Sequence, residues 1–497
     1  MKKSQNTKIR SISLLSALAL FGCGEGMAPT NSSAAQPDVL QAALDTTVQE
    51  GSPEAIGILR VANTASQQEL DVTAGLDSRA AQNIITYRNG PDGIAGSADD
   101  QVYDTLAELD AISYVATVAF DKLLSYAYAQ GYVPEVCDGV DNDKDGQVDE
   151  DRVCWTLEQV NAGTLPVSYY PEITVDKAGR PWVLFQTYND WYQNSGQFGL
   201  AVRNGAASWS QKLFGYLWYG AYGSLAVDPA GNLQIAWYKS DYGAGIYYTR
   251  VPAGGAPSQV TDGTLVDSPN ATTRHVSIAA TGTDALTLIY HQFGVEGDDL
   301  RIANGGPAGW TRRTAVTAGD TGADGVQAAM TPSGPVYAYV RTIVSGGVVT
   351  GHFAVFMDTN GVTTDVAQTP YPSSFSMATA SDGTVYLATA SNLAGYDTDL
   401  WSKKPGMAFQ RINSFQGSGA DVAVGPNGKP VLCHYTYQNS QYSLFLRRQD
   451  AAGAWVSESI APNGARCAIA VDASNTPHIV YRDEATLMLR YAARKLP

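Results

Sequence analysis

The residues with the clearest chemical potential lie between Glu135 and Glu150, where seven carboxylates occur within sixteen positions. Asp141, Asp143 and Asp145 alternate along the chain, and Gly146 permits a sharp turn that lets all three point inward. Hard oxygen ligands select Ca²⁺ rather than zinc or copper. Because so acidic a loop repels itself without a cation, the sequence predicts a calcium site with a structural role. A solvated acidic linker is the alternative.

The spacing of these oxygens matches the front half of an EF-hand-type loop. Oxygens stand at positions 1, 3 and 5, glycine at 6, a backbone carbonyl at 7 and a carboxylate at 9. Position 12 holds Arg152 instead of a bidentate Glu, so another carboxylate must close the shell. The expected ligands are Asp141, Asp143, Asp145, Gln147, Asp149 and Glu150.

The same segment resembles the metal-binding repeat of bacterial secreted proteins (MopE-type), Cys-Asp-Gly-x-Asp-Asn-Asp-Cys-Asp-Gly-x-x-Asp. The match begins at Cys137 and spans about fourteen residues. Lys144 stands where that family commonly has a second Cys, which leaves Cys137 to pair elsewhere, and Cys154 follows seventeen residues later. Closing that loop would stabilise the fold by roughly 3 kcal/mol, and an exported protein permits a disulfide.

Residues 155–497 repeat one pattern seven times: an apolar strand, a tight turn and a second apolar strand. A shorter third strand and a fourth strand follow. A period near 50 residues is typical of a propeller, so we expect a mainly β fold, a seven-bladed β-propeller with four-stranded blades. The turns begin 45 to 52 residues apart, at Asp176, Asp228, Ala280, Thr331, Ala380, Gly425 and Asp472.

The repeat unit, Val-Asp-x-x-Gly-x-Pro with flanking strands, resembles the sialidase-like and NHL-type propeller repeats of bacteria. That resemblance implies a fold and carries no activity by itself. The last repeat lacks its fourth strand, and residues 155–160 resemble residues 455–460 in pattern. We therefore expect the N-terminal strand to complete the last blade and remove its exposed edge. Cys433 and Cys467 fall in consecutive repeats. They form either a second disulfide or two buried thiols.

Ligands of a propeller usually meet its top face, where first strands start and second strands end. Several arginines near one mouth could clamp a carboxylate, as sialidases do with three. The alternative is that these arginines pair between blades. The sequence holds no His-x-x-x-His pair, Gly-x-Ser-x-Gly elbow or P-loop, so no catalytic residue is assigned. The candidates for ligand binding are Arg274, His275, His291, Arg341, His434, Arg466, Arg482 and Asp483, with Tyr170, Tyr222 and Lys239 nearby.

Residues 1–22 have the pattern of an export signal, with four cations before a short apolar run. The run ends at Leu20-Phe-Gly-Cys23, which resembles the lipobox of bacterial lipoproteins. The resemblance implies a lipid on Cys23 and, from Gly24, delivery to the outer membrane. An ordinary signal peptide cut nearby is the alternative. Residues 23–55 are small, polar and Pro-containing, as a flexible tether should be, and residues 133–154 form the acidic loop.

Residues 56–132 carry helical periodicity and predict a small all-α domain. The order Asn63-Thr-Ala, Gly75-Leu-Asp77, Ala80 and Ile84 resembles the tandem helix-hairpin-helix domain of bacterial DNA-uptake proteins. Asp77 stands where the second hairpin glycine belongs, and residues 60–130 hold four cations against ten acids. Because such a surface repels phosphate, DNA binding is a distant alternative to a structural or protein-docking role.

The whole chain has 497 residues and a formal charge of −16, which disfavours broad capture of nucleic acid or anionic lipid. The expected protein is an exported surface lipoprotein, held to the membrane through its lipid alone. Its calcium loop would be structural, and its propeller would bind a protein or a glycan without catalysis. A glycoside hydrolase or lyase on the top face is the alternative.

Overall fold

The computed structural model describes residues 48–138, 140–146, 154–161, 166–167, 170–188, 195–218, 222–239, 244–268, 275–294, 297–316, 325–345, 348–369, 375–390, 397–450 and 452–494. The expected signal segment, Cys23 and most of the tether lie outside this range. Among the described helices, none is both long and apolar enough to cross a membrane.

The N-terminal part is a small helical region with its own apolar core. Ser52 caps its first helix by accepting a hydrogen bond from the amide of Ala55 at 3.2 Å. Thr105 and Glu108 cap another helix reciprocally, as a capping box. The apolar residues of the periodic pattern lie on the inner faces of the helices and are buried there, for example Ile58 and Leu123. The elements are α1 (Pro53–Thr64), the π-helical turn η1 (Glu69–Thr73), α2 (Ser78–Arg88), α3 (Leu106–Asp110) and α4 (Thr117–Ala129).

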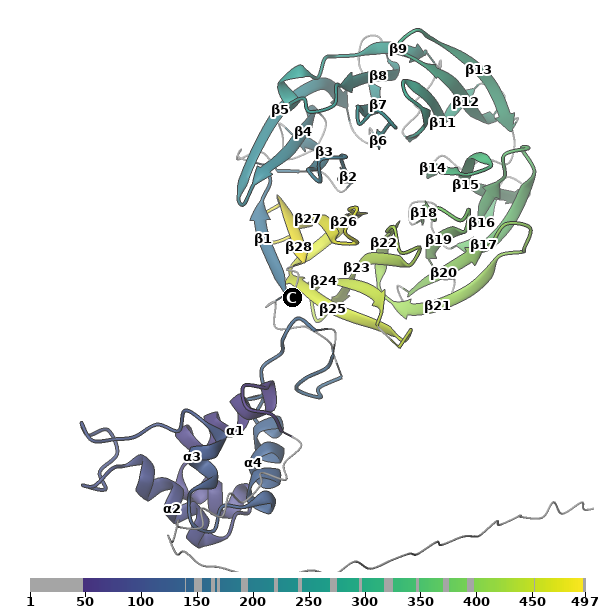
Figure 1. Ribbon diagram of the computed structural model, residues 1–497. Coiled ribbons are helices and arrows are strands. Elements are labelled where there is room, and N and C mark those ends of the chain that lie inside the picture. Colours follow the sequence, from purple (N-terminus) through teal and green to yellow (C-terminus); the bar gives the residue numbers. More distant parts are fainter. Residues whose placement is uncertain are drawn as a thin grey trace, which may run out of the picture. The chain divides into compact units, whose positions relative to one another are not determined.

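The rest of the chain is a seven-bladed β-propeller of four-stranded antiparallel sheets, as the repeats predict (Figure 1). The first three blades are β2 (Glu172–Val175), β3 (Pro181–Tyr188), β4 (Ser195–Gly205), β5 (Ser208–Trp218); β6 (Gly223–Val227), β7 (Leu233–Lys239), β8 (Gly245–Val251), β9 (Thr264–Asp267); and β10 (Val276–Gly282), β11 (Ala285–Gly294), β12 (Gly297–Gly306), β13 (Gly309–Val316). A short 3₁₀ turn, η2 (Pro257–Gln259), precedes β9.

The remaining blades follow the same order, with the innermost strand first. They are β14 (Val326–Thr331), β15 (Gly334–Ser345), β16 (Val348–Met357), β17 (Thr363–Thr369); β18 (Phe375–Thr379), β19 (Val385–Ala390), β20 (Asp397–Lys403), β21 (Gln410–Gln416); β22 (Ser418–Val424), β23 (Pro430–Gln438), β24 (Gln441–Gln449), β25 (Trp455–Pro462); and β26 (Gly464–Val471), β27 (Pro477–Asp483), β28 (Met488–Arg494) with β1 (Trp155–Gln159).

The ring is closed by the N-terminal strand, which confirms the predicted closure. β1 pairs with β28 from Trp155 opposite Arg494 to Gln159 opposite Arg490, and Figure 1 shows the two strands side by side. The last blade therefore contains both ends of the propeller sequence, and its outer strand is supplied by the segment that precedes the first blade.

Buried charge fastens this outer strand to the next blade. Glu158 of β1 is buried, and its carboxylate accepts bonds from Arg203 at 2.6 Å and from the indole of Trp209 at 3.0 Å. At the corresponding position of β25, Glu458 pairs with Arg494 of the following blade at 3.0 Å. In both cases an outer-strand carboxylate pairs with an arginine on the third strand of the next blade. The same kind of ion pair therefore recurs at two blade interfaces.

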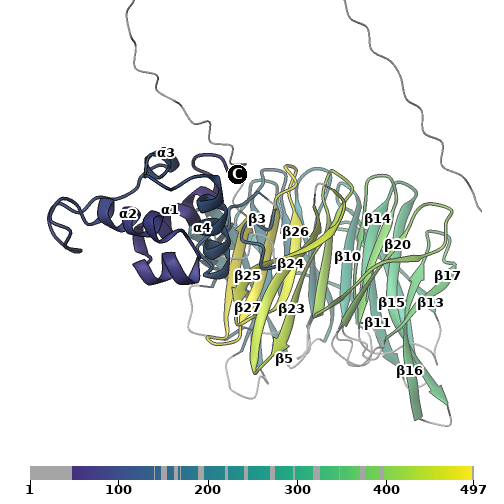
Figure 2. The same cartoon turned by 90° about the horizontal axis from the view of Figure 1, so that it is seen from below.

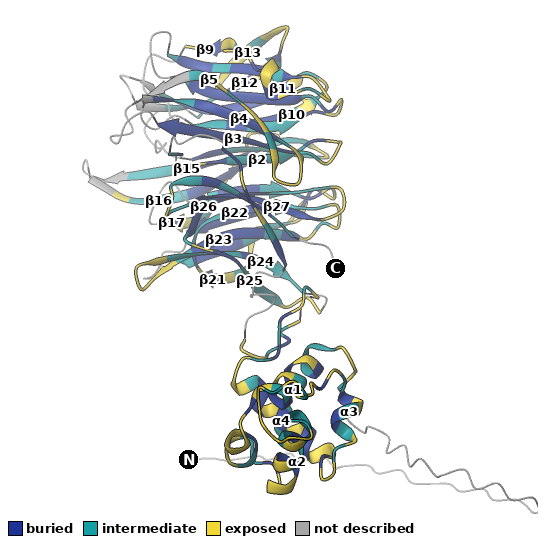
Figure 3. Ribbon diagram, turned by 90° about the vertical axis from the view of Figure 1, so that its left-hand side faces the viewer, coloured by how far each residue is buried: buried dark blue, intermediate teal, exposed yellow. Residues whose placement is uncertain are grey.

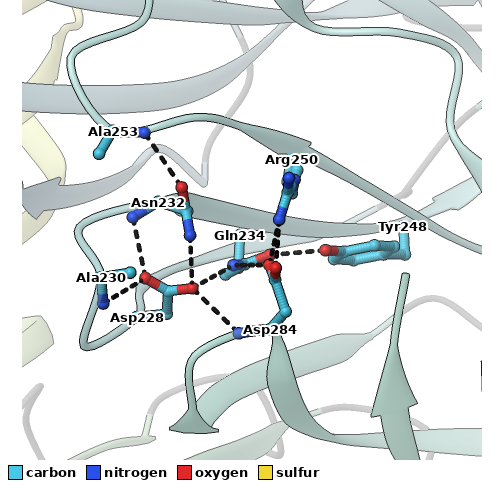
Figure 4. A network of polar contacts seen from close by, with 8 residues as sticks. All are labelled: Asp228, Ala230, Asn232, Gln234, Tyr248, Arg250, Ala253 and Asp284. Atoms are coloured by element: carbon cyan, nitrogen blue, oxygen red, sulfur yellow. Dashed lines mark hydrogen bonds and ion pairs between the residues drawn. The ribbon is translucent and has the colours of Figure 1, made fainter. Parts of the chain in front are cut away.

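The tight turn after the innermost strand is held by its aspartate, as the second blade shows. Asp228 accepts bonds from the amides of Ala230 and Asn232, each at 2.9 Å, and Gly231 takes a φ of 86° that favours glycine. The same carboxylate accepts from Gln234 and from the amide of Asp284 in the next blade (Figure 4). Burial tends to raise the pKa of Asp228, but these hydrogen bonds hold it below its ordinary value. The turn therefore also joins two blades.

Apolar residues of the middle strands form the propeller core, which Figure 3 shows as buried ribbon between exposed turns. Every residue of β3 is buried. Trp182 and Trp237 are among the largest fully buried side chains, and they belong to one cluster that spans neighbouring blades. Seen edge-on in Figure 2, the strands of successive blades stand beside one another. Apolar side chains packed between these sheets therefore help to hold the ring together.

Two disulfides are present. Cys137 bonds to Cys154, and Cys433 bonds to Cys467, which settles the second pair as a disulfide rather than two free thiols. The second bridge joins β23 to β26, the second strand of one blade and the first strand of the next. It therefore reinforces the interface beside the closing blade.

Candidate functional site

A cavity of about 150 Å³ opens where the innermost strands of all seven blades begin. Because each blade contributes its first strand, this pocket lies on the propeller axis. It is smaller than the roughly 300 Å³ at which drug-sized ligands are usually held, so it suits one small polar group. Its lining comprises Tyr170, Pro171, Glu172, Tyr222, Gly223, His275, Val276, Gly325, Val326, Gln327, Phe375, Ser376, Gly419, Ala420, Asp421, Arg466, Cys467 and Ala468.

Polar side chains at one repeated position of the inner strands connect the blades around this pocket. The hydroxyl of Ser224 accepts from the amide of Ile278 at 3.3 Å, and that of Ser277 accepts from Ala328 at 3.0 Å. Asp421 makes the same contact to Ile469 of the next blade at 2.8 Å. The pocket wall is therefore a ring of strands fixed to each other by side chains.

Two carboxyl groups of the pocket wall have raised pKa values. Burial raises the pKa of Glu172 to about 8, and the negative charge of Asp421 contributes further. Burial also raises the pKa of Asp421, although its hydrogen bonds with Ser376 and with the amide of Ile469 oppose the shift. Near neutral pH the Glu172 carboxyl group therefore holds its proton.

An aromatic row borders the carboxylates on the side of the first three blades. The rings of Tyr170 and Tyr222 lie 4.5 Å apart between centroids, and His275 stacks on Tyr222 at 3.5 Å. Tyr170 is 38% exposed, whereas His275 is buried. The row offers flat apolar faces next to hydrogen-bonding groups, an arrangement that suits a ligand with both kinds of surface.

Arg466 is the cation at this pocket among the described lining residues. A β-bulge interrupts the pairing of β26 between Ala465 and Ala468, and Arg466 has a φ of 55°. Such a bulge re-aims a side chain away from the regular pleat. The guanidinium lies 5.5 Å from the ring centroid of Tyr435, so it connects the pocket to the neighbouring blade.

Of the eight candidate residues for ligand binding, His275 and Arg466 line the pocket, together with the nearby Tyr170 and Tyr222. Arg341 and Arg482 do not. Arg341 forms an ion pair with Asp365, and Arg482 is buried and pairs with Glu484 at 2.7 Å. These two arginines are thus already neutralised by acids in their own surroundings. Arg274 lies outside the described residues.

The other candidates serve the fold. Asp483 accepts the amide of Ala485 at 3.0 Å in a turn, and His291 is fully buried in β11. His434 is buried between the rings of Phe415 and Phe445. Burial lowers the pKa of His434 to about 3, so it stays neutral near pH 7 and is a poor proton donor there. Lys239 lines a separate hollow between β5 and β7.

Glu172 and Asp421 are the pocket residues that the sequence did not single out. Each stands four positions before its turn, at Asp176 and Gly425, in a strand whose other residues are mostly apolar. An acid inside an apolar innermost strand was the available signal. Its meaning depends on which residues face the axis, and that is decided by how the strands tilt and where they begin.

The acidic loop brings together part of its expected ligand set. Carboxylate oxygens of Glu135, Asp141 and Asp143 lie within 4.8 Å of one another, which makes a possible metal-binding cluster. Asp141 accepts the amide of Gly146 at 3.0 Å, so the chain winds around the first carboxylate as such a loop requires. Glu135, which the ligand list did not include, is buried beneath the loop. Gln147, Asp149 and Glu150 lie outside the described residues.

We expect Glu172→Gln to make stability less dependent on pH. The carboxyl pKa is 4.5 ordinarily and about 8 in the fold, so between these values the folded state binds more protons than the unfolded state. Wild-type stability should therefore fall as pH rises through this window, and the variant should be spared that loss. Thermal unfolding at pH 5, 7 and 8.5 measures it, with Glu54→Gln in α1 as the control carboxylate. Parallel curves for Glu172→Gln and wild type would contradict the expectation.

No family model matches this chain, and no curated protein matches it either. Solved structures do resemble it at the level of fold. A protein of unknown function from Dyadobacter fermentans is 10% identical over 70% of this chain and 99% of its own, with a TM-score of 0.41.

Two further propellers are similar to this chain to the same extent. The NanB sialidase of Streptococcus pneumoniae is 10% identical over 68% of this chain and 70% of its own, with a TM-score of 0.37. The SapL1 lectin, solved with alpha methyl fucoside, is 9% identical over 60% of this chain and 97% of its own, with a TM-score of 0.40. Similarity at this level assigns the chain neither a ligand nor a reaction.

Proposed function

We propose that the propeller is a non-catalytic binding module that takes one sugar residue of a glycan into its axial pocket. The observation that carries this proposal is the row Tyr170, Tyr222 and His275 standing beside Glu172 and Asp421 in one cavity. A sugar ring has apolar C–H faces that pack on aromatic rings, and hydroxyls that need donors and acceptors around its edge. Both kinds of partner are present.

The charge of the pocket narrows the class of sugar. Glu172 and Asp421 interact electrostatically, and the whole chain has a formal net charge of −16. A carboxylated sugar would bring a negative charge into a pocket lined by two buried carboxyl groups, and that charge costs free energy unless it is fully paired. Arg466 offers one cation for such pairing. A neutral or amine-bearing sugar therefore fits the pocket better than an acidic one.

The proposal is tested by applying the exported chain to an array of neutral, amine-bearing and acidic glycans, followed by calorimetry on the ligands it retains. Tyr222→Ala should weaken binding about ten-fold, because it removes the central ring of the row, a contact of about 1.4 kcal/mol. Tyr114→Ala, which removes a 57%-exposed tyrosine of the helical region, is the matched control. An array without retained ligands, or equal affinities for both variants, would refute the proposal.

Glycoside hydrolysis is the second candidate, favoured by the raised pKa of Glu172 next to Asp421. Glycosidases need one carboxyl that is protonated near neutral pH and a second carboxylate nearby. Against this role, Asp421 is engaged by Ser376 and by the backbone of the next blade. Mass spectrometry of the retained glycans distinguishes the two functions: shortened products that disappear with Glu172→Gln indicate hydrolysis, and intact glycans indicate binding.

For the acidic loop we propose Ca²⁺ bound by Asp141, Asp143 and Glu135, with Asp145, Gln147, Asp149 and Glu150 available to complete the shell. One Asp141 carboxylate oxygen is buried without a hydrogen-bond partner in the described structure. A cation would compensate that buried charge. The Cys137–Cys154 bridge encloses the loop, so the ion would act on a segment already constrained.

Calcium should raise the thermal stability of this segment, and a chelator should reverse the effect. Asp141→Asn should weaken Ca²⁺ binding at least ten-fold by calorimetry, because it removes the first ligand and its charge. Asp121→Asn in α4 is a control with the same charge change. Binding of Ca²⁺ with equal affinity by wild type and Asp141→Asn would rule out the site.

We further propose export and anchoring through a lipid on Cys23, with the outer membrane or cell surface as the destination. The two disulfides support an oxidising compartment outside the cytoplasm. Labelling cells with a fatty-acid analogue should mark the wild-type chain and leave Cys23→Ser unmarked. Label on both chains, or on neither, would contradict anchoring at this residue.

A further inference from the structure

A second aromatic cluster lies on the β23–β24 hairpin of the sixth blade. Tyr437 and Tyr442 face each other across the hairpin with their centroids 4.6 Å apart, and Tyr435 lies 5.8 Å from Tyr442. Tyr435 is buried, whereas Tyr437 is 51% exposed. The hairpin turns at Asn439 and Ser440, both with positive φ, so these rings stand near the end of the blade. Tyr435, Tyr437 and Tyr442 are called the hairpin cluster below.

The hairpin cluster borders the axial pocket. Tyr435 lies opposite Ser418 in the strand pairing, and its ring packs on the backbone of Gly419, which lines the pocket. A Cβ at Gly419 would come within 2.4 Å of that ring. Arg466, another lining residue, lies 5.5 Å from the centroid of Tyr435. A continuous series of side chains thus leads from Arg466 at the pocket through Tyr435 and Tyr442 to the exposed Tyr437.

Packing of the fold does not account for Tyr437. Tyr437 is half exposed at the end of a hairpin. A polar residue at this position would leave the strand pairing with Tyr442 intact. The cluster instead presents the amphipathic ring of Tyr437 to solvent beside a pocket, backed by Tyr442 and the buried Tyr435. Such groups are enriched where proteins bind ligands. The pocket itself admits only one small group, so any larger ligand must continue across its rim.

We propose that the ligand is an oligosaccharide chain rather than a single sugar, with one residue in the axial pocket and later residues crossing Arg466 onto the hairpin cluster. This inference rests on the proposed glycan binding and adds that the glycan must be more than one sugar residue long. The pocket row Tyr170, Tyr222 and His275 lies on the first three blades, whereas the hairpin cluster lies on the sixth. Two aromatic subsites on separate blades, joined at the pocket, fit an extended chain.

The probes are β-1,4-linked oligomers of glucose and of glucosamine, from one to six units, titrated calorimetrically into the exported chain. Affinity should rise at least ten-fold between one and four units. Tyr437→Ala should abolish that rise and leave the affinity for the single sugar unchanged. Tyr222→Ala should weaken binding of every length. Tyr114→Ala is the exposed-tyrosine control, and unchanged unfolding temperatures would show that the variants are folded.

The outcomes separate this inference from the function on which it rests. If single sugars and longer oligomers bind equally, and Tyr437→Ala has no effect, the chain-length inference is overturned while the pocket proposal stands. If neither oligomer series binds and the glycan array retains nothing, both are overturned. If oligomers bind with rising affinity that is lost in Tyr437→Ala alone, the hairpin cluster is part of the binding site.

Discussion

Glu158→Gln should lower the free energy of unfolding of the propeller by about 3 kcal/mol at pH 7. The variant removes the charge of a carboxylate that is 5% exposed and leaves Arg203, 24% exposed, without its partner. Burial tends to raise the pKa of Glu158, but the bonds from Arg203 and Trp209 hold it below 4.5, so the group is charged in the wild type. Its contribution is present above about pH 4.5 and is lost as pH falls through the lowered value.

Denaturant unfolding of both chains at pH 7 and pH 4 measures this effect, which should shrink at the lower pH. Asp77→Asn is the matched control, because it removes an exposed ion pair with Arg79 and keeps a side chain able to cap α2. That control should be indistinguishable from wild type. A loss below about 0.5 kcal/mol in Glu158→Gln would mean that ring closure does not depend on the buried pair.

Removing the bridge between the sixth and seventh blades should cost more. Cys433→Ala with Cys467→Ala opens a covalent loop with a sequence separation of 34 residues. The chain-entropy relation gives about 4 kcal/mol for a loop of that size. Cys467 also lines the axial pocket, and its neighbour Arg466 sits in a bulge of the same strand. The double variant should therefore lose glycan affinity as well as stability.

The other disulfide supplies the comparison. Cys137→Ala with Cys154→Ala opens a loop with a separation of 17 residues and should cost about 3 kcal/mol. Neither of these cysteines lines the pocket, so glycan affinity should be unchanged. Urea unfolding gives the two stability losses, and calorimetry gives the two affinities. Equal affinities for both double variants would show that the bridge at Cys467 does not shape the pocket.

The propeller was predictable because its signals are local and repeated. An aspartate followed three residues later by a glycine, as at Asp176 and Gly179, specifies a tight turn in a few residues, and the repeat spacing specifies the blade. The closing strand followed from the likeness of Trp155–Val160 to Trp455–Ile460. The pairing of the cysteines in the propeller did not follow, because neighbours in consecutive repeats can be bonded or merely buried side by side.

The axial pocket could be predicted only in part. Tyr170, Tyr222 and His275 were placed on the top face from their positions at strand starts, and they do line one cavity. Arg341 and Arg482 hold comparable positions in their repeats, yet Arg341 pairs with Asp365 of the same blade and Arg482 pairs with Glu484 two residues further on. Which nearby acid an arginine reaches depends on strand pairing and side-chain direction in the folded blade, and the repeat pattern specifies neither.

The strand order of the last blade has a consequence for biosynthesis. β1 is translated first among the strands of the propeller, but its partner β28 is translated last. The first strand therefore stays without its sheet partner until the last strand of the propeller has been made. A chain that ends before β28 cannot seal the ring and keeps unpaired strand edges, which are prone to aggregation. Closure of the ring therefore requires all seven blades to have been made.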